Sequence, residues 1–341
     1  MRNIYDYTLE ELEDYFVSHD DKKFRATQIY EFLYKKRIES FEEMINIGKN
    51  NIEKLNNNFS FYKLKLLNKQ EDKDVKKYLF ELIDGQTIES VLMYHNYGIS
   101  ICVSSQVGCN MGCKFCESGR LKKVRNLEAY EIVEQILFIE KDIKKRISHV
   151  VVMGIGEPFD NYENVMRFVK IVNNPKGIDI GSRHITISTC GLINGIKKFM
   201  NEPGQVNLAI SLHAPNDNLR KQIMPIAKAN SLTDLIDTIK EYIKKTNRRV
   251  TFEYIMLENI NDSLDNAKEL ANLLKGINCY VNLIPYNETE NIGYKRTKNT
   301  QIIKFYDILK KNKINVTIRK EFGSKVDAAC GQLRANQNIG G

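Results

Sequence analysis

Three cysteines close together in the sequence are the residues that most clearly predict chemistry. Cys109, Cys113 and Cys116 stand at CxxxCxxC spacing. Clustered thiols serve in disulfides, zinc sites or iron–sulfur clusters. A disulfide would leave one of the three over, and structural zinc takes four ligands, usually from paired motifs that the nearest histidines do not complete. Three thiolates suit a [4Fe-4S] cluster in which one iron is open to a small molecule; a zinc site with a distant fourth ligand is the alternative.

Composition places this motif in a basic chain of 341 residues. The net charge is +8, which is compatible with a phosphate-rich partner. No apolar run approaches the roughly 20 residues of a membrane span, and the acidic N-terminus lacks the apolar core of a signal peptide. An odd number of cysteines, seven in all, favours a reducing compartment. We therefore expect a cytoplasmic protein with no membrane association.

The first part of the chain predicts a small accessory unit. Residues 1–60 read as helical, with capping boxes at Thr8–Glu11 and Ser40–Glu43 and a helix over 24–37. Residues 61–98 form a β-hairpin extension, with strands over 78–82 and 87–93 around the turn Asp84–Gly85. Glu89 lies on the second of these strands. Taken alone, it is expected to face solvent.

From residue 99 the pattern alternates strand and helix, which predicts an α/β fold. The expected architecture is a partial (β/α)6 barrel over 99–322, followed by a C-terminal loop over 323–341. A further strand is expected at 315–319. The expected strands are 99–104, 149–153, 184–189, 207–212, 249–256 and 279–284, and the expected helices are 128–143, 161–172, 192–200, 231–246, 262–274 and 300–312.

The ends of these strands carry small, polar or ionisable residues. Parallel strands place such residues on one rim, so we expect them to bind a ligand beside the cysteines. Glycines would let the backbone approach that ligand, Glu157 would accept from an amino group, and serine or asparagine would bond ribose or carboxylate. A lone histidine after a strand is more often structural. The predicted ligand-binding residues are Gly156, Glu157, Ser188, Ser211, Leu212, His213 and Asn287.

Several motifs together resemble a known family. They are Cys102–Cys109 with the cysteine triplet, Gly156–Glu157–Pro158, Ser211–Asn216 and Asp327–Leu333. The triplet alone is typical of the radical S-adenosylmethionine (SAM) superfamily. The set resembles the RlmN/Cfr adenosine methyltransferases over nearly the whole chain, including the N-terminal helical unit.

This resemblance implies methylation of adenine carbon 2 in two stages. Cys330 would take a methyl group from one SAM, and the [4Fe-4S] cluster would cleave a second SAM to a radical that activates this methyl group, so that two SAM are used per turnover. The activated carbon would join Cys330 to the adenine. Glu89 would then remove the adenine proton, and Cys102 would attack the sulfur of Cys330 to release the product and leave a disulfide. Taken alone, Cys102 and Cys330 would be core residues.

The resemblance also implies the partners. The substrate would be an adenosine near the peptidyl transferase centre of 23S rRNA, and also tRNA beside the anticodon. A flavodoxin or ferredoxin would supply electrons, and the enzyme would act as a monomer. Within the family, methylation of carbon 8 is the alternative; the motifs Gln106–Cys109 and Gly156–Pro158 favour carbon 2. A non-catalytic iron–sulfur or zinc RNA-binding module is the alternative from another class.

Overall fold

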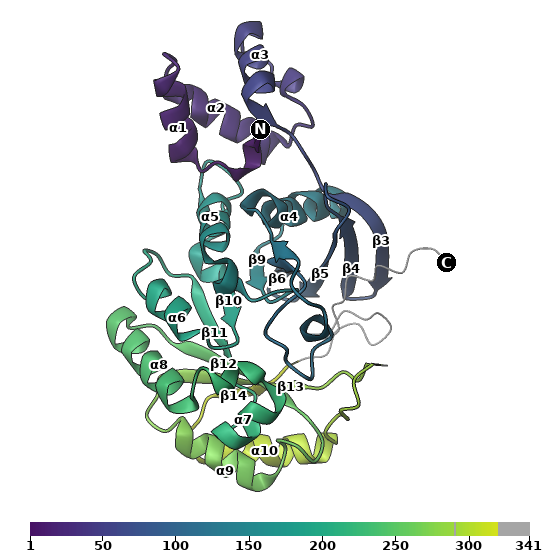
Figure 1. The fold of residues 1–341 in the computed structure, drawn as a ribbon, viewed down its shortest axis with the longest axis vertical. Helices are drawn as coiled ribbons and strands as arrows, with labels where there is room; N and C mark the ends of the chain where they lie inside the picture. Colours follow the sequence, from purple (N-terminus) through teal and green to yellow (C-terminus); the bar gives the residue numbers. More distant parts are fainter. Residues whose placement is uncertain (290, 320–341) are drawn as a thin grey trace.

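The N-terminal helices form a unit at one end of the molecule (Figure 1). The computed structural model describes residues 1–289 and 291–319. Helix α1 (Leu9–Ser18) begins with the predicted capping box, since the Thr8 N–H donates to Glu11 Oε2 at 2.9 Å and the Glu11 N–H donates to Thr8 Oγ1 at 3.3 Å. Helices α2 (Phe24–Glu31) and α3 (Lys49–Asn58) follow. Strand β1 (Arg2–Asn3) runs parallel to β2 (Phe59–Ser60), so the unit's first and last residues lie side by side.

The expected helix over 24–37 is present, but α2 passes into a wider π-helical turn, Phe32–Lys36, which ends at Arg37 with a positive φ of 55°. Another local prediction for this unit is wrong. The second capping box is absent: Phe41–Glu43 form one 3-10 turn, and the Ser40 side chain makes no capping hydrogen bond. The Glu43 carboxylate instead accepts from the Glu39 N–H at 3.0 Å.

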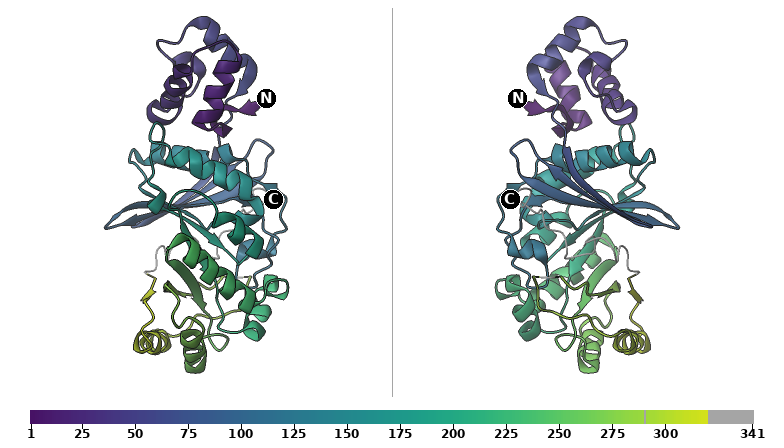
Figure 2. Two further views of the ribbon diagram at one scale, coloured as in Figure 1. Left: turned by 90° about the vertical axis from the view of Figure 1, so that its left-hand side faces the viewer. Right: turned by 90° about the vertical axis from the view of Figure 1, so that its right-hand side faces the viewer.

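Ten strands form one mixed sheet, in the order β14-β13-β12-β11-β10-β9-β6-β5-β4-β3. From β6 to β14 all neighbours are parallel. This confirms the predicted series of β–α units, with helices along the outer face of the curved sheet (Figures 1 and 2). The parallel strands are β6 (Gly98–Val103), β9 (His149–Val152), β10 (Ile185–Thr189), β11 (Asn207–Ser211), β12 (Val250–Met256), β13 (Cys279–Pro285) and β14 (Val316–Ile318). The covering helices are α4 (Ala129–Ile143), α5 (Tyr162–Asn173), α6 (Ile193–Phe199), α8 (Leu232–Thr246), α9 (Leu264–Leu273) and α10 (Asn299–Lys311).

The predicted hairpin extends this sheet. Strand β4 (Val75–Glu81) pairs antiparallel with β5 (Thr87–His95), and Gly85 in the turn has the expected positive φ, 78°. Strand β5 also pairs antiparallel with β6, so the hairpin enlarges the wall of the barrel. An unpredicted strand, β3 (Lys65–Asp72), lies at the edge. Short helix α7 (Asp217–Ile223) was also not predicted, because five of its seven residues are polar.

Helix α4 connects the N-terminal unit to the sheet and carries a buried acid. The Tyr130 N–H at its start donates to Asp6 Oδ1 at 2.8 Å. Further along, Glu134 is buried, and its Oε1 has no hydrogen-bond partner within the described residues. Because burial disfavours the carboxylate, it raises the pKa of Glu134 to about 7. Among the helices of residues 1–289 and 291–319, none has the length and apolarity needed to cross a membrane.

The Glu134→Gln substitution is expected to stabilise the protein at pH 8 by about 1–3 kcal/mol. In the folded state Glu134 keeps its proton up to about pH 7, whereas in the unfolded state it loses the proton near pH 4.5. Glu134 therefore does not lower the free energy of unfolding below pH 4.5, and lowers it progressively as the pH rises from 4.5 toward 7. Urea unfolding at pH 5 and pH 8 measures this difference. The control is Glu53→Gln, at an exposed position of α3. If the free energy of unfolding changed equally between pH 5 and pH 8 in Glu134→Gln and in the wild type, the prediction would be contradicted.

Candidate active site

The three motif cysteines lie in a loop whose two ends are paired. Strands β7 (Gln106–Val107) and β8 (Arg125–Asn126) form a short antiparallel ladder, with Val107 opposite Arg125. Inside it, the Cys109 N–H donates to the Leu121 carbonyl at 3.0 Å. Gly108 has a φ of 73°, and a Cβ there would lie 2.2 Å from the Lys122 carbonyl oxygen. This close return of the chain requires glycine just before the first motif cysteine.

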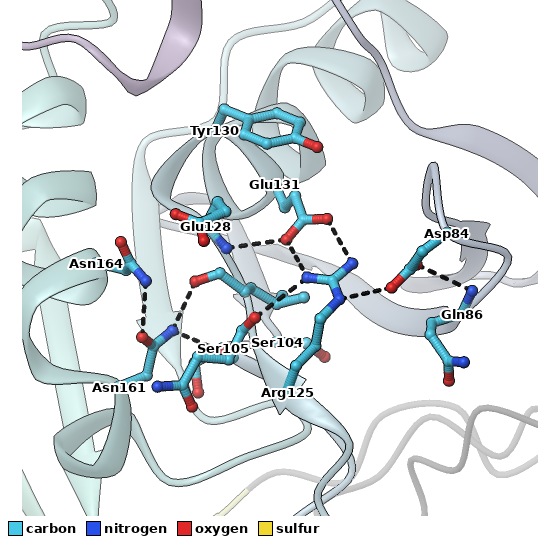
Figure 3. A network of polar contacts seen from close by, with 12 residues as sticks. Asp84, Gln86, Ser104, Ser105, Arg125, Glu128, Tyr130, Glu131, Asn161 and Asn164 are labelled. Carbon is cyan, nitrogen blue, oxygen red and sulfur yellow. Dashed lines mark hydrogen bonds and ion pairs between the residues drawn. The ribbon is translucent and has the colours of Figure 1, made fainter. Parts of the chain in front are cut away.

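Arg125, at the base of this loop, binds residues of helix α4 and of the hairpin turn (Figure 3). Its Nη1 and Nη2 donate to the two carboxylate oxygens of Glu131 at 2.7 and 2.8 Å, and its Nε donates to Asp84 at 2.7 Å. Beside it, Asn161 Nδ2 donates to the Ser105 and Leu127 carbonyls, both at 2.8 Å. The loop is therefore held by α4, by the hairpin turn and by the start of α5, which limits how far the cysteines can move.

A cavity of about 140 Å³ lies between this loop and the ends of the parallel strands. All three motif cysteines line it, as does Phe115 between them. The predicted strand-end residues that also line it are Gly156, Glu157, Ser188, Ser211 and His213. These residues come from four separate segments, which meet at one rim. Leu212 and Asn287 are not in this lining: Leu212 is fully buried, and Asn287 follows the end of β13.

The thiols form a donor set that suits a cluster. Burial raises the pKa of Cys109 to about 12 and that of Cys113 further, and the neighbouring thiols add to both shifts. A bound cationic metal centre reverses this preference and favours the thiolates. Three thiols at one side of the cavity are the donor set of a [4Fe-4S] cluster with one open iron.

Glu157 is held by backbone amides. Its Oε1 accepts from the Phe159 N–H at 3.0 Å, and its Oε2 accepts from the Cys190 N–H at 2.7 Å. Each oxygen therefore already has one partner before any ligand amine is bound. Gly156, with a φ of 112°, is required by packing, because a Cβ would lie 2.7 Å from the Gln106 side chain. Gly156 and Glu157 therefore stabilise the backbone of the rim, and both also line the cavity.

His213 presents a fixed tautomer at the cavity. Its Nδ1 accepts from the Ile255 N–H at 3.0 Å, so the ring proton lies on Nε2. The ring packs edge-on against Phe115, with centroids 4.8 Å apart. Burial lowers the pKa of His213 to about 3, which keeps the ring neutral. The structural role expected for a lone histidine is thus present, together with a position in the cavity lining.

Comparison with known proteins assigns this arrangement to a family. Residues 103–274 match the Radical SAM superfamily, and residues 2–60 match the Ribosomal RNA large subunit methyltransferase N-terminal domain. The chain is 56% identical to a Streptococcus thermophilus protein named "Probable dual-specificity RNA methyltransferase RlmN", over 98% of this chain and 88% of that protein. It belongs to the RlmN family of radical SAM RNA methyltransferases.

Other members agree with this assignment. A Spiroplasma citri protein with the same name is 53% identical, over 98% of each chain. A crystal structure of a radical SAM methyltransferase from Sphaerobacter thermophilus superposes with a TM-score of 0.93 at 39% identity, covering 98% of this chain and all of that one. The likeness to a radical SAM methyltransferase therefore extends over the whole fold.

Glu89 and Cys102 both lie on the inner face of the barrel wall. Glu89 is 3% exposed, so the expectation of a solvent-facing residue is wrong; its Oε1 pairs with Lys77 Nζ at 2.9 Å. Cys102 is opposite Val91 in the β5–β6 ladder and is buried in an apolar cluster with Met93. Because side chains alternate along a strand, Glu89, Val91 and Met93 share the face that Cys102 occupies. No disulfide joins two cysteines of residues 1–319, and Cys330 lies outside the described residues.

The sequence analysis missed several residues of this site. Glu253, opposite Ser211 on β12, lines the cavity and accepts from Asn282 Nδ2 at 2.8 Å. Burial raises the pKa of Glu253. Glu253 could have been noticed in the sequence, because it is the one charged residue in the strand at 250–256. Cys190 also lines the cavity.

Proposed function

We propose that this protein methylates carbon 2 of an adenosine in 23S rRNA, at the peptidyl transferase centre, and of an adenosine beside the anticodon of tRNA. The observation that carries the proposal is the meeting of the cysteine loop and the strand-end residues at one cavity. Met153 lines this cavity and also packs against the apolar cluster that contains Cys102. The names of the Streptococcus and Spiroplasma relatives, which call them dual-specificity RNA methyltransferases, support two RNA substrates.

The cofactors would occupy the cavity beside the loop. Cys109, Cys113 and Cys116 would hold a [4Fe-4S] cluster, and when bound the cluster reduces SAM to a 5′-deoxyadenosyl radical. Five of the proposed SAM-binding residues line the cavity, and Leu212 and Asn287 follow strands that end at the same rim. His213 would donate from Nε2, because its Nδ1 is already bonded. A second SAM in each turnover would methylate Cys330.

Glu89 would act as the base that removes the proton from adenine carbon 2. Its side chain is buried, and burial disfavours an ionised carboxylate. The ammonium group of Lys77 at 2.9 Å favours the ionised form. Cys102 would then attack the sulfur of Cys330: an S–S bond would form, the bond between that sulfur and the transferred carbon would break, and this carbon would keep the electron pair and take up a proton to become the methyl group of the released adenine. A flavodoxin or ferredoxin would supply electrons. The enzyme would act as a monomer in the cytoplasm.

An assay on unmodified RNA tests this function. The protein is reconstituted anaerobically with iron and sulfide, reduced, and incubated with SAM and either rRNA or tRNA. Mass spectrometry of the digested nucleosides is expected to show adenosine methylated at carbon 2 from both substrates. Methylation at carbon 8 would favour the alternative activity within the family. Absence of reductive SAM cleavage would favour a non-catalytic RNA-binding module.

The Lys77→Met substitution is expected to slow release of the product from the protein–RNA adduct. Removing this cation makes the Glu89 carboxylate harder to ionise, so the pH at which release becomes fast should rise. The decay of a preformed adduct, followed at several pH values, measures this shift. Lys77→Arg keeps the charge and should keep the wild-type profile.

A neighbouring lysine supplies the control for this prediction. Lys76 points to the other face of β4 and pairs with Glu71 at 3.1 Å. Lys76→Met is therefore expected to leave the pH profile unchanged. A Lys77→Met profile that coincides with that of Lys76→Met would contradict the role assigned to this ion pair.

A further inference from the structure

A buried arginine lies next to the cysteine loop without an acidic partner. Arg220, on α7, is 0% exposed. In residues 1–289 and 291–319, no carboxylate lies within the 4.0 Å of an ion pair with its guanidinium. Its Nη1 is buried and has no hydrogen-bond partner in the same part of the chain. A charge removed from water in this way is costly unless an opposite charge accompanies it.

The hydrogen bonds that Arg220 makes are to neutral backbone carbonyls, so they do not balance its positive charge. Its Nη2 donates to the Cys190 carbonyl at 2.7 Å, and its Nε donates to the Leu212 carbonyl at 3.2 Å. These bonds fix the chain just after β10 and β11, where the cavity rim forms. Neutral donors could make such bonds with backbone carbonyls. They therefore account for two nitrogens of the guanidinium but not for its permanent positive charge.

Helix α7 brings this charge to the cysteine loop. The Lys114 N–H, beside Cys113, donates to the carbonyl of Ile223 at the end of the helix at 2.9 Å. Arg220 itself donates to the carbonyl of Cys190, which lines the cavity together with the three motif cysteines. Asp217, on the same helix, accepts from the Leu232 N–H at 2.9 Å, and Glu157 accepts from backbone amides. The positive charge of Arg220 is thus held between the cavity rim and the helix that contacts the cysteine loop.

We propose that Arg220 is a positioning residue whose charge balances the thiolate-bound cluster and raises its reduction potential. This inference rests on the proposed function, in which the three cysteines hold a [4Fe-4S] cluster. Reduction adds one electron from an external donor, so the negative charge beside Arg220 increases while no bond of the protein is made or broken. A fixed cation stabilises the reduced form more than the oxidised form, because the net charge around a cluster is one determinant of its potential.

A pair of substitutions separates the charge from the hydrogen bonds. Arg220→Gln and Arg220→Lys both lose the planar fork, but only Arg220→Lys stays cationic. Each protein is reconstituted anaerobically, its iron and sulfide are quantified, and the midpoint reduction potential is measured by spectroelectrochemical titration. We expect a more negative potential for Arg220→Gln and a potential near the wild-type value for Arg220→Lys.

Arg248 supplies a matched control. It also donates to backbone carbonyls, those of Gln205 and Val206, but these precede β11 at the end of the strand away from the cysteine loop. Arg248→Gln removes the same charge and the same kind of bond. Its cluster is expected to keep the wild-type potential. An equal shift in Arg248→Gln and Arg220→Gln would overturn the inference, because it would show a general effect of net charge.

The remaining outcomes also decide the matter. Loss of the cluster from Arg220→Gln alone would support a need for the charge, whereas loss from both Arg220 variants would overturn the inference and assign the residue to folding. If Arg220→Gln binds the cluster and its reduction potential is unchanged, the inference is overturned. If that protein also binds SAM more weakly, Arg220 would be assigned to binding the SAM carboxylate. A wild type that takes up no iron and sulfide would refute the proposed function itself.

Discussion

Replacing Cys102 with alanine is expected to stop the reaction at a covalent protein–RNA adduct, whereas Cys330→Ala is expected to give neither product nor adduct. Without Cys330 no sulfur carries the methyl group. Without Cys102 the carbon can still join Cys330 to the adenine, but nothing attacks that sulfur to release it. The position of Cys102 suits this step, because it shares the inner barrel face with Glu89 and is buried beside Met93.

Denaturing gels with labelled RNA and intact-mass spectrometry distinguish these results. Cys102→Ala should shift labelled RNA to the mass of the protein, and nuclease digestion should leave one modified nucleotide on Cys330. The control is Cys279→Ala: Cys279 is as buried as Cys102 but lies at the start of β13, away from the cavity rim. Turnover by Cys330→Ala, or release of product by Cys102→Ala at the rate of Cys279→Ala, would contradict the proposed mechanism.

The β–α units could be predicted because their strands are apolar and their helices are long. The edge strand β3 could not, since its residues are mostly polar and partly or fully exposed, so they show no apolar alternation. Helix α7 was missed because most of its residues are polar, whereas α6, of the same length, buries Ile196 and Phe199. The boundaries of α7 depend on local contacts, such as the Asn216 side chain accepting from the Leu219 N–H at 2.9 Å.

The cavity rim could be predicted because the ends of parallel strands meet there. The environment of single residues could not. Strand β5 is buried on both faces from Thr87 to Met93, so alternation gave no sign that Glu89 points inward. Lys77, its partner, lies on another strand, and the pairing depends on the β4–β5 register. The partners of Arg220 are backbone carbonyls, which have no signature in the sequence.

Substituting any one of Cys109, Cys113 and Cys116 with alanine is expected to abolish cluster binding and to reduce methylation to the level of a reaction without enzyme. Each thiolate binds a different iron of a [4Fe-4S] cluster, so the two remaining ligands cannot hold the assembly. Iron and sulfide content after anaerobic reconstitution, together with the cluster's visible absorption, measures the loss.

Cys190→Ala is the informative comparison, because Cys190 lines the same cavity without belonging to the motif. If the three motif cysteines serve a cluster with an open iron, Cys190→Ala should retain iron and sulfide in the wild-type ratio. If the site instead held zinc, Cys190 would be the nearest candidate for the fourth thiolate that structural zinc requires, and its removal should release the metal. Wild-type protein that binds zinc and loses it in Cys190→Ala would therefore exclude an open iron, and with it every step that depends on SAM cleavage at this site.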